Sequence, residues 1–276
     1  MDRSSNPLKR RYGDDAEHLR DAPSYAQLAD VIARGSCRSF TRRDVSPQLV
    51  EVLCAAALAS PTKSDLQQRD IVIMRDPAAK QRLIALIDTE SWVSDVPNIA
   101  VFCGNNRRQR RLHDLRQRPF ANDHLDAFFN ASVDAAIALA AFVNAAEAVG
   151  LGCCPISAVR NRAGEVSDLL SLPDQVFPVA GLAFGYPDED SQRISPRLPL
   201  KCTVHIDRFA DKDLDGDIEA YDRRREATAP YAAQRATEVF GTAQDYGWSE
   251  DKARQYALKE RADFGAFVRS KGFRLD

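Results

Sequence analysis

The chain has 276 residues, which is enough for one large domain or for one domain with an extension. Its hydrophobic fraction of 44% and its charged fraction of 28% are ordinary for a globular protein. With 38 basic and 40 acidic side chains, no global charge draws the chain towards nucleic acid or an anionic membrane.

The N-terminal segment 1–20 is polar and mixed in charge, which predicts a mobile tail. It lacks the apolar stretch of a signal peptide, so we expect a cytoplasmic protein rather than an exported one. The six cysteines show no CxxC spacing and no companion histidine pair, which argues against zinc. Cys54 and Cys103 lie in apolar runs typical of inert thiols, while the adjacent Cys153 and Cys154 leave a redox pair as a less favoured alternative.

Residues 21–205 alternate helical patterns with short apolar runs, which predicts a folded core. We expect helices over 24–34, 46–59, 77–87, 126–149 and 161–171. Strands are expected over 70–75, 98–104 and 177–185, with a further short strand after the glycine-rich turn at 150–152. Residues 206–276 are charged and helical in pattern, which predicts a C-terminal extension.

The segment 126–149 is rich in alanine and apolar nearly all round, which predicts a helix buried on every side. A transmembrane span is the competing interpretation. Asp134 and other polar residues interrupt the segment, and alanine contributes little insertion energy, so we expect no membrane span. A helix this long and apolar in a chain of this size predicts that the core continues into a second subunit.

Residues 34–38 form an Arg-x-Ser-x-Arg run between two predicted helices. Two forked guanidiniums and a hydroxyl within about four residues suit the oxygens of a phosphate. Taken alone, a solvated basic loop explains this run better.

Three further stretches favour a ligand site. LASPTKSDLQ (58–67) gathers short polar groups suited to hydrogen bonding a polar heterocycle, and GLGCCPIS (150–157) has small residues that let backbone N–H groups approach a ligand. SPRLP (195–199) places Arg197 between prolines, which restrict its backbone as a fixed clamp requires.

The order RxSxRxF, ASPTxxxxQ, a long alanine-rich helix, GLGxxPI, VAGLAFGYP and PRLP resembles the FMN-dependent nitroreductases. The PRLP segment and the long C-terminal part resemble the oxygen-insensitive, mostly NADPH-preferring branch that includes bacterial flavin reductases. The resemblance covers residues 24 to about 273, and it lies in the shared order and spacing rather than in any single motif.

The resemblance implies an α+β nitroreductase-like fold, with a central, mostly antiparallel sheet flanked by helices. It also implies an intertwined homodimer with FMN sites at the interface and a helical C-terminal extension that covers the flavin or the partner subunit. The flavin would carry the chemistry, taking two electrons from NADPH, or from NADH, and passing them from its N5 to a nitroaromatic, a quinone or a free flavin in a ping-pong cycle.

The resemblance also implies the roles of individual residues. The phosphate of FMN would be bound by Arg34, Gly35, Ser36, Arg38 and Arg197. The loop along the flavin, often from the partner subunit, would supply Thr62, Lys63, Ser64 and Gln67. The ring edge near N5 and O4 would face Pro155, Ile156, Ser157 and Ala158. Glu90 takes the place of a glutamine that often reaches the flavin, and Arg235 and Arg261 match arginines that contact the nicotinamide cofactor or the substrate.

The chain departs from the family pattern at several of these positions. Ser195 replaces a phosphate-side lysine, and Ser157 and Ala158 replace glycines. Glu90 would place an acid near an electron-rich ring, which is unfavourable for reduced flavin. These departures leave FMN binding expected, and they weaken any inference about the substrate range.

No nucleophile or acid–base dyad is expected, and none of the four histidines is expected to be catalytic. The arginines 223–225 together with Arg235 suggest recognition of the 2′-phosphate of NADPH, with a solvated helix face as the alternative. A flavin reductase that supplies reduced FMN to a partner is the second functional hypothesis. The third is a redox-inert FMN-binding or nucleic-acid-associated protein that uses RRQRR (107–111) and RRR (223–225), although solvated helix faces explain those runs better.

Overall fold

The computed structural model describes residues 6–87, 91–188 and 193–276, which fall into two compact units. The first unit combines residues 1–35 with 193–260, and the second combines 36–192 with 261–276. This division differs from the expected core over 21–205 and extension over 206–276, because the chain passes between the units at residues 35, 192 and 260.

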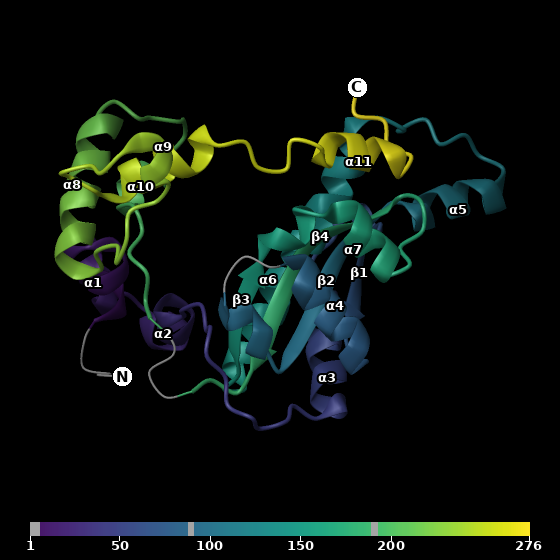
Figure 1. The fold of residues 1–276 in the computed structure, drawn as a ribbon, viewed down its shortest axis with the longest axis horizontal. Helices are drawn as coiled ribbons and strands as arrows, with labels where there is room; N and C mark the ends of the chain where they lie inside the picture. Colours follow the sequence, from purple (N-terminus) through teal and green to yellow (C-terminus); the bar gives the residue numbers. More distant parts are fainter. Residues whose placement is uncertain (1–5, 88–90, 189–192) are drawn as a thin grey trace. The chain divides into compact units, whose positions relative to one another are not determined.

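A four-stranded antiparallel sheet forms the centre of the second unit, as the α+β expectation requires (Figure 1). Its strands lie in the order β1-β2-β4-β3, with β1 over Arg69–Ile73, β2 over Asn98–Asn105, β3 over Gly152–Ile156 and β4 over Val176–Gly185. Every neighbouring pair is antiparallel, and a register shift interrupts the β2–β4 pairing between Phe102 and Cys103.

Helices cover both faces of this sheet. Side chains of β2 alternate between the faces: Ile99 and Val101 join one core cluster, and Ala100 and Phe102 join the other. The first cluster includes residues of α4 (Pro77–Ile87) and α7 (Ala163–Leu169), and the second includes residues of α3 (Pro47–Leu58) and α6 (Leu125–Ala148). Both faces are therefore buried, which explains why the strands read as continuous apolar runs.

The ends of the covering helices follow from local sequence. The side chain of Ser46 accepts a hydrogen bond from Leu49 N at 3.2 Å, and Pro47 occupies the first turn of α3. In the same way Asp76 accepts from Ala79 N at 2.7 Å where α4 begins. A shorter helix, α11 (Phe264–Ser270), packs with Phe177 and Ala131 in a third core cluster, so the last residues of the chain belong to the second unit.

Helix α6 is 24 residues long, and within the described residues it is the helix long and apolar enough to cross a membrane. It is not buried on every side of one chain as expected: five of its alanines and Phe142 are buried, while Leu125, Phe129 and Val133 are exposed. The exposed residues are spaced four apart, so they form one stripe along the helix. The composition of α6 is that of a core helix with a second apolar face.

The first unit is helical in its described residues. It contains α1 (Pro7–Tyr12), α2 (Tyr25–Ala33), α8 (Leu214–Thr228), α9 (Thr237–Phe240), α10 (Trp248–Ala257) and the 3-10 turns η1 (Asp14–Asp21) and η5 (Leu200–Cys202). The described part of the segment expected as a mobile tail thus folds into α1 and η1. Asn6 caps α1 by accepting from Leu8 N at 3.0 Å, and Leu8 is buried, so a short apolar contact orders a segment that is otherwise polar.

The cysteines behave as packing residues. Cys153 and Cys154 are both buried, and because they follow one another on β3 they enter the core clusters on opposite faces of the sheet. Burial raises the pKa of Cys103 to about 12, and burial also raises the pKa of Cys54. Cys54 and Cys103 are therefore poor nucleophiles, as the sequence analysis expected of inert thiols.

Candidate functional site

The first unit contains a cavity of about 940 Å³ whose wall includes both Arg34 and Arg197. These are two of the arginines expected to bind the phosphate of FMN. Tyr221, Trp248 and Tyr231 also line the cavity, and the Tyr221 hydroxyl donates to Pro196 O at 3.0 Å, which fixes the segment that carries Arg197. The cavity therefore combines guanidinium groups with aromatic surface.

A buried arginine that the sequence analysis did not single out, Arg11, links the backbone next to Arg34 with the backbone next to Arg197. Arg11 on α1 is 6% exposed, and its guanidinium donates to Ile32 O at 2.7 Å, to Ser195 O at 3.3 Å and to Arg34 O. In return Arg197 N donates to Arg11 O at 2.6 Å. Arg11 thus fixes the backbone on either side of the cavity wall, and it does so from the segment that was expected to be a tail.

Gly35 follows Arg34 where the backbone comes close to another segment of the first unit. A Cβ at Gly35 would lie 2.5 Å from the carbonyl oxygen of Arg193. No side chain fits in that space, so glycine at this position is a packing requirement.

In the second unit, Ser36 and Arg38 lie on the segment that extends beside β3. Ser36 forms an isolated parallel bridge with Cys153, and Cys37 N donates to Cys153 O at 2.9 Å. The Arg38 side chain is exposed, with its Cζ 5.7 Å from the centre of the Trp92 ring. The two expected phosphate ligands of this unit are therefore held on extended backbone next to the sheet.

The segment Pro155–Ala158 ends β3 and begins the 3-10 turn η4 (Ser157–Arg160). Ile156 and Ala158 are buried in the core, whereas Pro155 and Ser157 are exposed. The side chain of Arg261 contacts this segment and the turn after it: its Nε donates to Asn161 Oδ1 at 2.8 Å and its Nη2 donates to Ser157 Oγ at 3.2 Å. The structure thus brings together two residues, Ser157 and Arg261, that the sequence resemblance assigned separately to flavin and to substrate.

The loop that carries Thr62, Lys63, Ser64 and Gln67 has an unusual backbone. Ser64, Asp65 and Gln67 all have positive φ, at 47°, 56° and 53°, a region that non-glycine residues rarely adopt. Thr62 Oγ1 accepts from Gln67 N at 2.9 Å and so closes the loop, which leaves the side chains of Lys63, Ser64 and Gln67 exposed. Backbone strain of this kind concentrates at ligand-binding sites.

Asp134 of α6 fixes this loop from inside the core. It is 0% exposed, and its two carboxylate oxygens accept from Lys63 N at 3.0 Å and from Gln68 N at 2.9 Å. Helix α5 (Arg107–Arg116) holds the same loop from outside, because Arg108 donates to Gln67 O and Gln109 donates to Leu66 O. The sequence analysis took Asp134 only as an interruption of an apolar helix; an isolated acid in a buried stripe was the signal of its role.

The arginines expected to contact the nicotinamide cofactor have different surroundings. Arg235 lies with its Nε 3.5 Å from Asp251 Oδ1, and Arg223 pairs with Glu219 at 3.7 Å. Arg224 donates to Arg197 O, whereas Arg225 lines the cavity beside Tyr231. The run 223–225 is therefore not one solvated face, and Arg225 is its member on the cavity wall.

The remaining residues singled out by the sequence analysis contribute less to the candidate site. Glu90 lies outside the described residues. Ser195 contributes its backbone, since its carbonyl accepts from Arg11 Nη1. The histidines take local structural contacts: His124 accepts from Asp126 N at 3.3 Å where α6 begins, and His205 accepts from Ala210 N at 3.4 Å.

Comparison with known proteins identifies the family. Residues 31–186 match the sequence profile described as "Nitroreductase family", and residues 195–276 match "Nitroreductase family, C-terminal domain". An "FMN reductase [NAD(P)H]" of Bacillus subtilis is 30% identical over 244 residues, which is 87% of this chain and 95% of that protein.

An "Oxygen-insensitive NADPH nitroreductase" of Salmonella typhimurium is 31% identical over 229 residues, which is 83% of this chain and 90% of that protein. Among solved structures, Bacillus megaterium NfrA2 has a TM-score of 0.80 at 28% identity, covering 90% of this chain and 98% of its own. These matches span both compact units and agree with the observed sheet. The chain therefore belongs to the nitroreductase family.

Proposed function

We propose that the chain is an FMN-dependent oxidoreductase that passes two electrons from NAD(P)H to a nitroaromatic or quinone acceptor. The observation that carries the proposal is the family match over almost the whole chain, including the C-terminal domain, together with relatives named for flavin and nitro-group reduction. FMN, when bound, supplies the two-electron chemistry, and the protein supplies position and electrostatics.

The residues present fit a phosphorylated, planar cofactor. Arg34 and Arg197 line a cavity that also has aromatic walls, which suits a charged phosphate next to an apolar ring. In the second unit, Ser36 and Arg38 stand on fixed backbone, and the strained loop 62–67 presents a lysine, a serine and a glutamine to solvent. We assign phosphate binding to Ser36 and Arg38 in the second unit and, independently, to Arg34 and Arg197 in the cavity of the first unit. Contacts with the ring are assigned to the loop 62–67 and to Pro155–Ala158, and contact with the acceptor or nicotinamide to Arg261.

A second candidate function is supply of reduced FMN to a partner oxygenase. The printed name of the Bacillus subtilis relative, an FMN reductase, favours this hypothesis. The two functions differ in what leaves the site: a nitroreductase retains its flavin, whereas a supplier of reduced flavin releases it. The free cysteines of the described chain suit the reducing cytoplasm in which we place either activity.

Anaerobic titration of the purified, FMN-loaded protein with NADPH tests the proposal. We expect the flavin absorbance to bleach, and to return when a nitroaromatic or a quinone is added. FMN should remain on the protein through gel filtration if it is a resident cofactor. Flavin that stays oxidised under excess NADPH would contradict any reductase function, and flavin lost on the column would favour the flavin supplier.

Replacement of Arg38 by Ala should weaken FMN binding. The change removes a charge-assisted contact to the phosphate, worth about 1.5–3 kcal/mol, so flavin should dissociate on dilution. Flavin fluorescence measured against protein concentration reports the loss. Arg42→Ala is the matched control, because Arg42 is also exposed and lies four residues along the same segment. Full flavin occupancy in Arg38→Ala would defeat the assignment.

We propose that the chain forms a homodimer through the exposed face of α6. Leu125 is 50% exposed, Phe129 60% and Val133 37%, and an apolar stripe of this kind on a helix that already packs on the sheet needs a cover. A second copy of the chain is the cover that the family resemblance implies.

The variant Phe129→Glu should therefore separate the subunits, because it would bury a carboxylate in an apolar interface. Sedimentation velocity at micromolar concentration measures the change from dimer to monomer, with Ile206→Glu as the control, since Ile206 is an exposed apolar residue of the first unit. A wild-type protein that sediments as a flavin-loaded monomer would exclude the dimer.

We further propose a preference for NADPH over NADH through the C-terminal arginines. Arg235, the residue expected from sequence, lies near the buried Asp251, whereas Arg225 lines the cavity and its buried Nε has no hydrogen-bond partner among the described residues. The structure therefore adds Arg225 as a second candidate for the 2′-phosphate.

Steady-state kinetics of Arg225→Ala and Arg235→Ala with both nicotinamides separate the two candidates. We expect one of the variants to lower kcat/KM for NADPH by about tenfold, which is ~1.4 kcal/mol, with NADH unaffected. The variant that shows the loss identifies the residue. A wild-type kcat/KM for NADH at or above that for NADPH would rule out the preference itself.

A further inference from the structure

Helix α5 carries an arrangement of charge that works against its own stability. Arg107 and Arg108 occupy its first turn, where the helix dipole favours acidic residues. The backbone of this turn is capped by Asn105, whose Oδ1 accepts from Arg108 N at 3.2 Å, so the unfavourable feature is the charge alone. Arg107 and Arg111 are also spaced four apart, a like-charge pair that destabilises a helix. Asp70 compensates the charge of Arg108 at 2.7 Å, whereas Arg107 has no ion-pair partner among the described residues. An uncompensated departure from a local rule of this kind is characteristic of a functional site.

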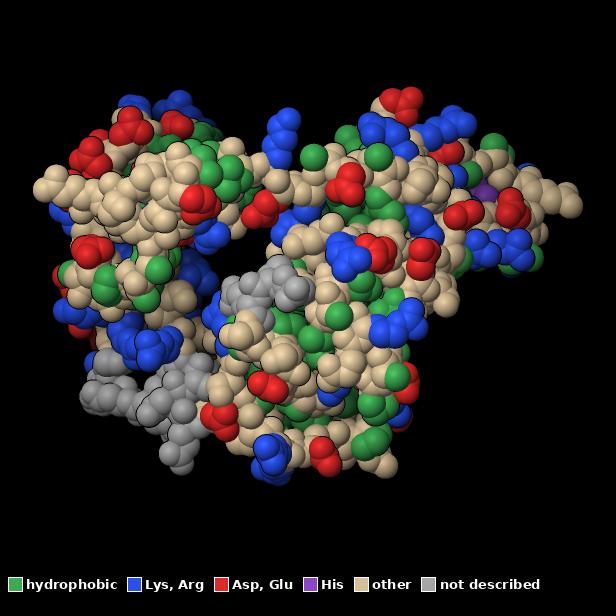
Figure 2. Space-filling model, in the orientation of Figure 1, with side chains coloured by type: hydrophobic (Ala, Val, Ile, Leu, Met, Phe, Trp, Pro, Cys, Tyr) green, Lys and Arg blue, Asp and Glu red, His purple; other side chains and the backbone are tan. Residues whose placement is uncertain are grey.

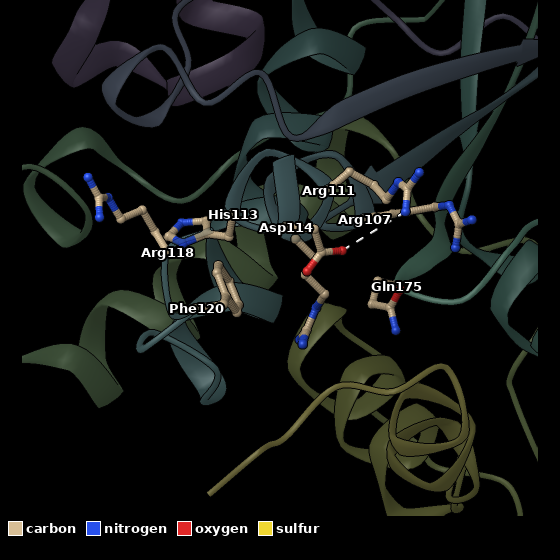
Figure 3. Close-up of a pocket in the computed structure, with 8 residues that line it drawn as sticks. Arg107, Arg111, His113, Asp114, Arg118, Phe120 and Gln175 are labelled. Atoms are coloured by element: carbon tan, nitrogen blue, oxygen red, sulfur yellow. Dashed lines mark ion pairs between the residues drawn. The ribbon is translucent and has the colours of Figure 1, made fainter. Parts of the chain in front are cut away.

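Arg107 and Arg111 line a pocket of about 400 Å³ in the second unit, where Figure 3 shows them on one side and Arg118 on the other. Its described lining comprises Arg107, Arg110, Arg111, His113, Asp114, Arg118, Phe120 and Gln175. Asp114 is the acidic member of this lining, and its carboxylate lies 4.0 Å from Arg111 Nη1. At the right of Figure 2, over α5, basic side chains lie beside acidic ones and a histidine. The pocket thus has a large excess of positive charge.

Not all of these arginines are free to meet a ligand. Arg110 pairs with Asp123 at 2.5 Å, and this contact lowers the pKa of the Asp123 carboxyl below its ordinary value. The guanidinium of Arg110 also lies 4.8 Å from the centre of the Phe120 ring. By contrast, within the described residues Arg107 and Arg118 have no ion-pair partner, so their charge is left uncompensated at the pocket.

The walls of the pocket are fixed by backbone contacts. Gln175 has a φ of 60°, and it is held there because its N donates to Lys271 O at 2.7 Å and its O accepts from Asn106 N at 2.9 Å. At the other end of α5, Gln117 also has a positive φ, and Arg118 N donates to His113 O at 3.0 Å. His113 Nδ1 lies 2.9 Å from Pro119 O, so the ring that packs against Phe120 is anchored too.

We propose that this pocket binds the phosphate group of a small-molecule anion, either a free phosphate or pyrophosphate or the phosphate of a nucleotide. Guanidinium groups on a fixed helix are suited to the several oxygens of a phosphoryl group, and a bound dianion would offset the repulsion within α5. None of the lining residues belongs to the set proposed for FMN or NADPH, so this site is additional to the proposed function.

A single-stranded nucleic acid is the other class of ligand for a basic surface, but the pocket favours it less. Such ligands stack their bases on exposed aromatic rings along a groove. Phe120 is instead packed against His113 at 5.1 Å between ring centres and against Arg110. A solvent-accessible cluster of guanidiniums without a free aromatic face suits a compact anion.

Isothermal titration of the FMN-loaded protein with pyrophosphate, at constant ionic strength, tests the proposal. We expect saturable binding at one site per chain, and a loss of affinity on the order of tenfold or more in Arg107→Ala/Arg111→Ala. The matched control is Arg82→Ala/Arg116→Ala, which removes the same charge from exposed positions outside the pocket, one of them on α5 itself. The control should stay within about twofold of wild type.

Two further measurements complete the experiment. Without added phosphate, Arg107→Ala/Arg111→Ala should unfold at the same or a higher temperature than wild type, because like-charge repulsion is relieved, which shows that the variant is folded. Titration with inorganic phosphate and with AMP then distinguishes the two sources: tighter binding of AMP than of phosphate indicates a nucleotide, and equal or weaker binding indicates a free phosphate or pyrophosphate.

Three results would overturn the proposal. The first is an absence of saturable binding of pyrophosphate, phosphate and AMP to the wild-type protein. The second is an equal loss of affinity in both double variants, which would reduce the effect to general charge screening. The third is a single-stranded oligonucleotide that binds more tightly than pyrophosphate and depends on Arg107 and Arg111, which would assign the surface to nucleic acid.

Discussion

The carboxylate of Asp134 has no access to water, and it lies on the buried face of a helix whose other buried residues are alanines, a phenylalanine and a valine. Burial of an unpaired charge costs several kcal/mol, so the position is tolerable only because two backbone N–H groups, those of Lys63 and Gln68, donate to its two oxygens. The two donors flank the segment that turns through three residues of positive φ. Without them the loop would lose the contacts that compensate its strain, and the helix would carry an unsatisfied acid.

This arrangement links the core of the second unit to its surface chemistry. The core face of α6 is set by packing on the sheet, and Asp134 extends that rigidity to the loop 62–67. Arg69, which follows Gln68, is also buried and donates to Leu58 O at 2.7 Å and Ser60 O at 2.9 Å, so it fixes the entry to the same loop. A strained, exposed loop is thereby supported at both ends by buried charged side chains, which is how a fold can position polar groups before any ligand arrives.

Much of the fold was predictable because it depends on local pattern. Three apolar runs gave strands, since both faces of the sheet are covered, and the alanine-rich segment gave its longest helix. The N-terminal helix and the role of Arg11 were not predictable, because one arginine among several becomes structural only when carbonyl oxygens from residues 32, 34 and 195 surround it. The burial of α6 was overestimated for a related reason: hydropathy reports that a face is apolar and cannot say whether the same chain covers it.

The arginines of this chain show why composition alone misleads about function. Arg11 and Arg254 are buried and donate hydrogen bonds to carbonyl or carboxylate oxygens of the chain, so they stabilise the fold. Arg107, Arg118 and Arg225 lie on cavity walls with donor groups to which no acceptor of the described chain is bonded. The sequence does not distinguish the structural arginines from those at the cavity walls, and the near-neutral net charge of the chain indicates neither. The two kinds of arginine differ in how many hydrogen-bond acceptors the fold places around the guanidinium. A guanidinium whose N–H groups lack acceptors, and which lies at a concave surface, is available to bind an anion.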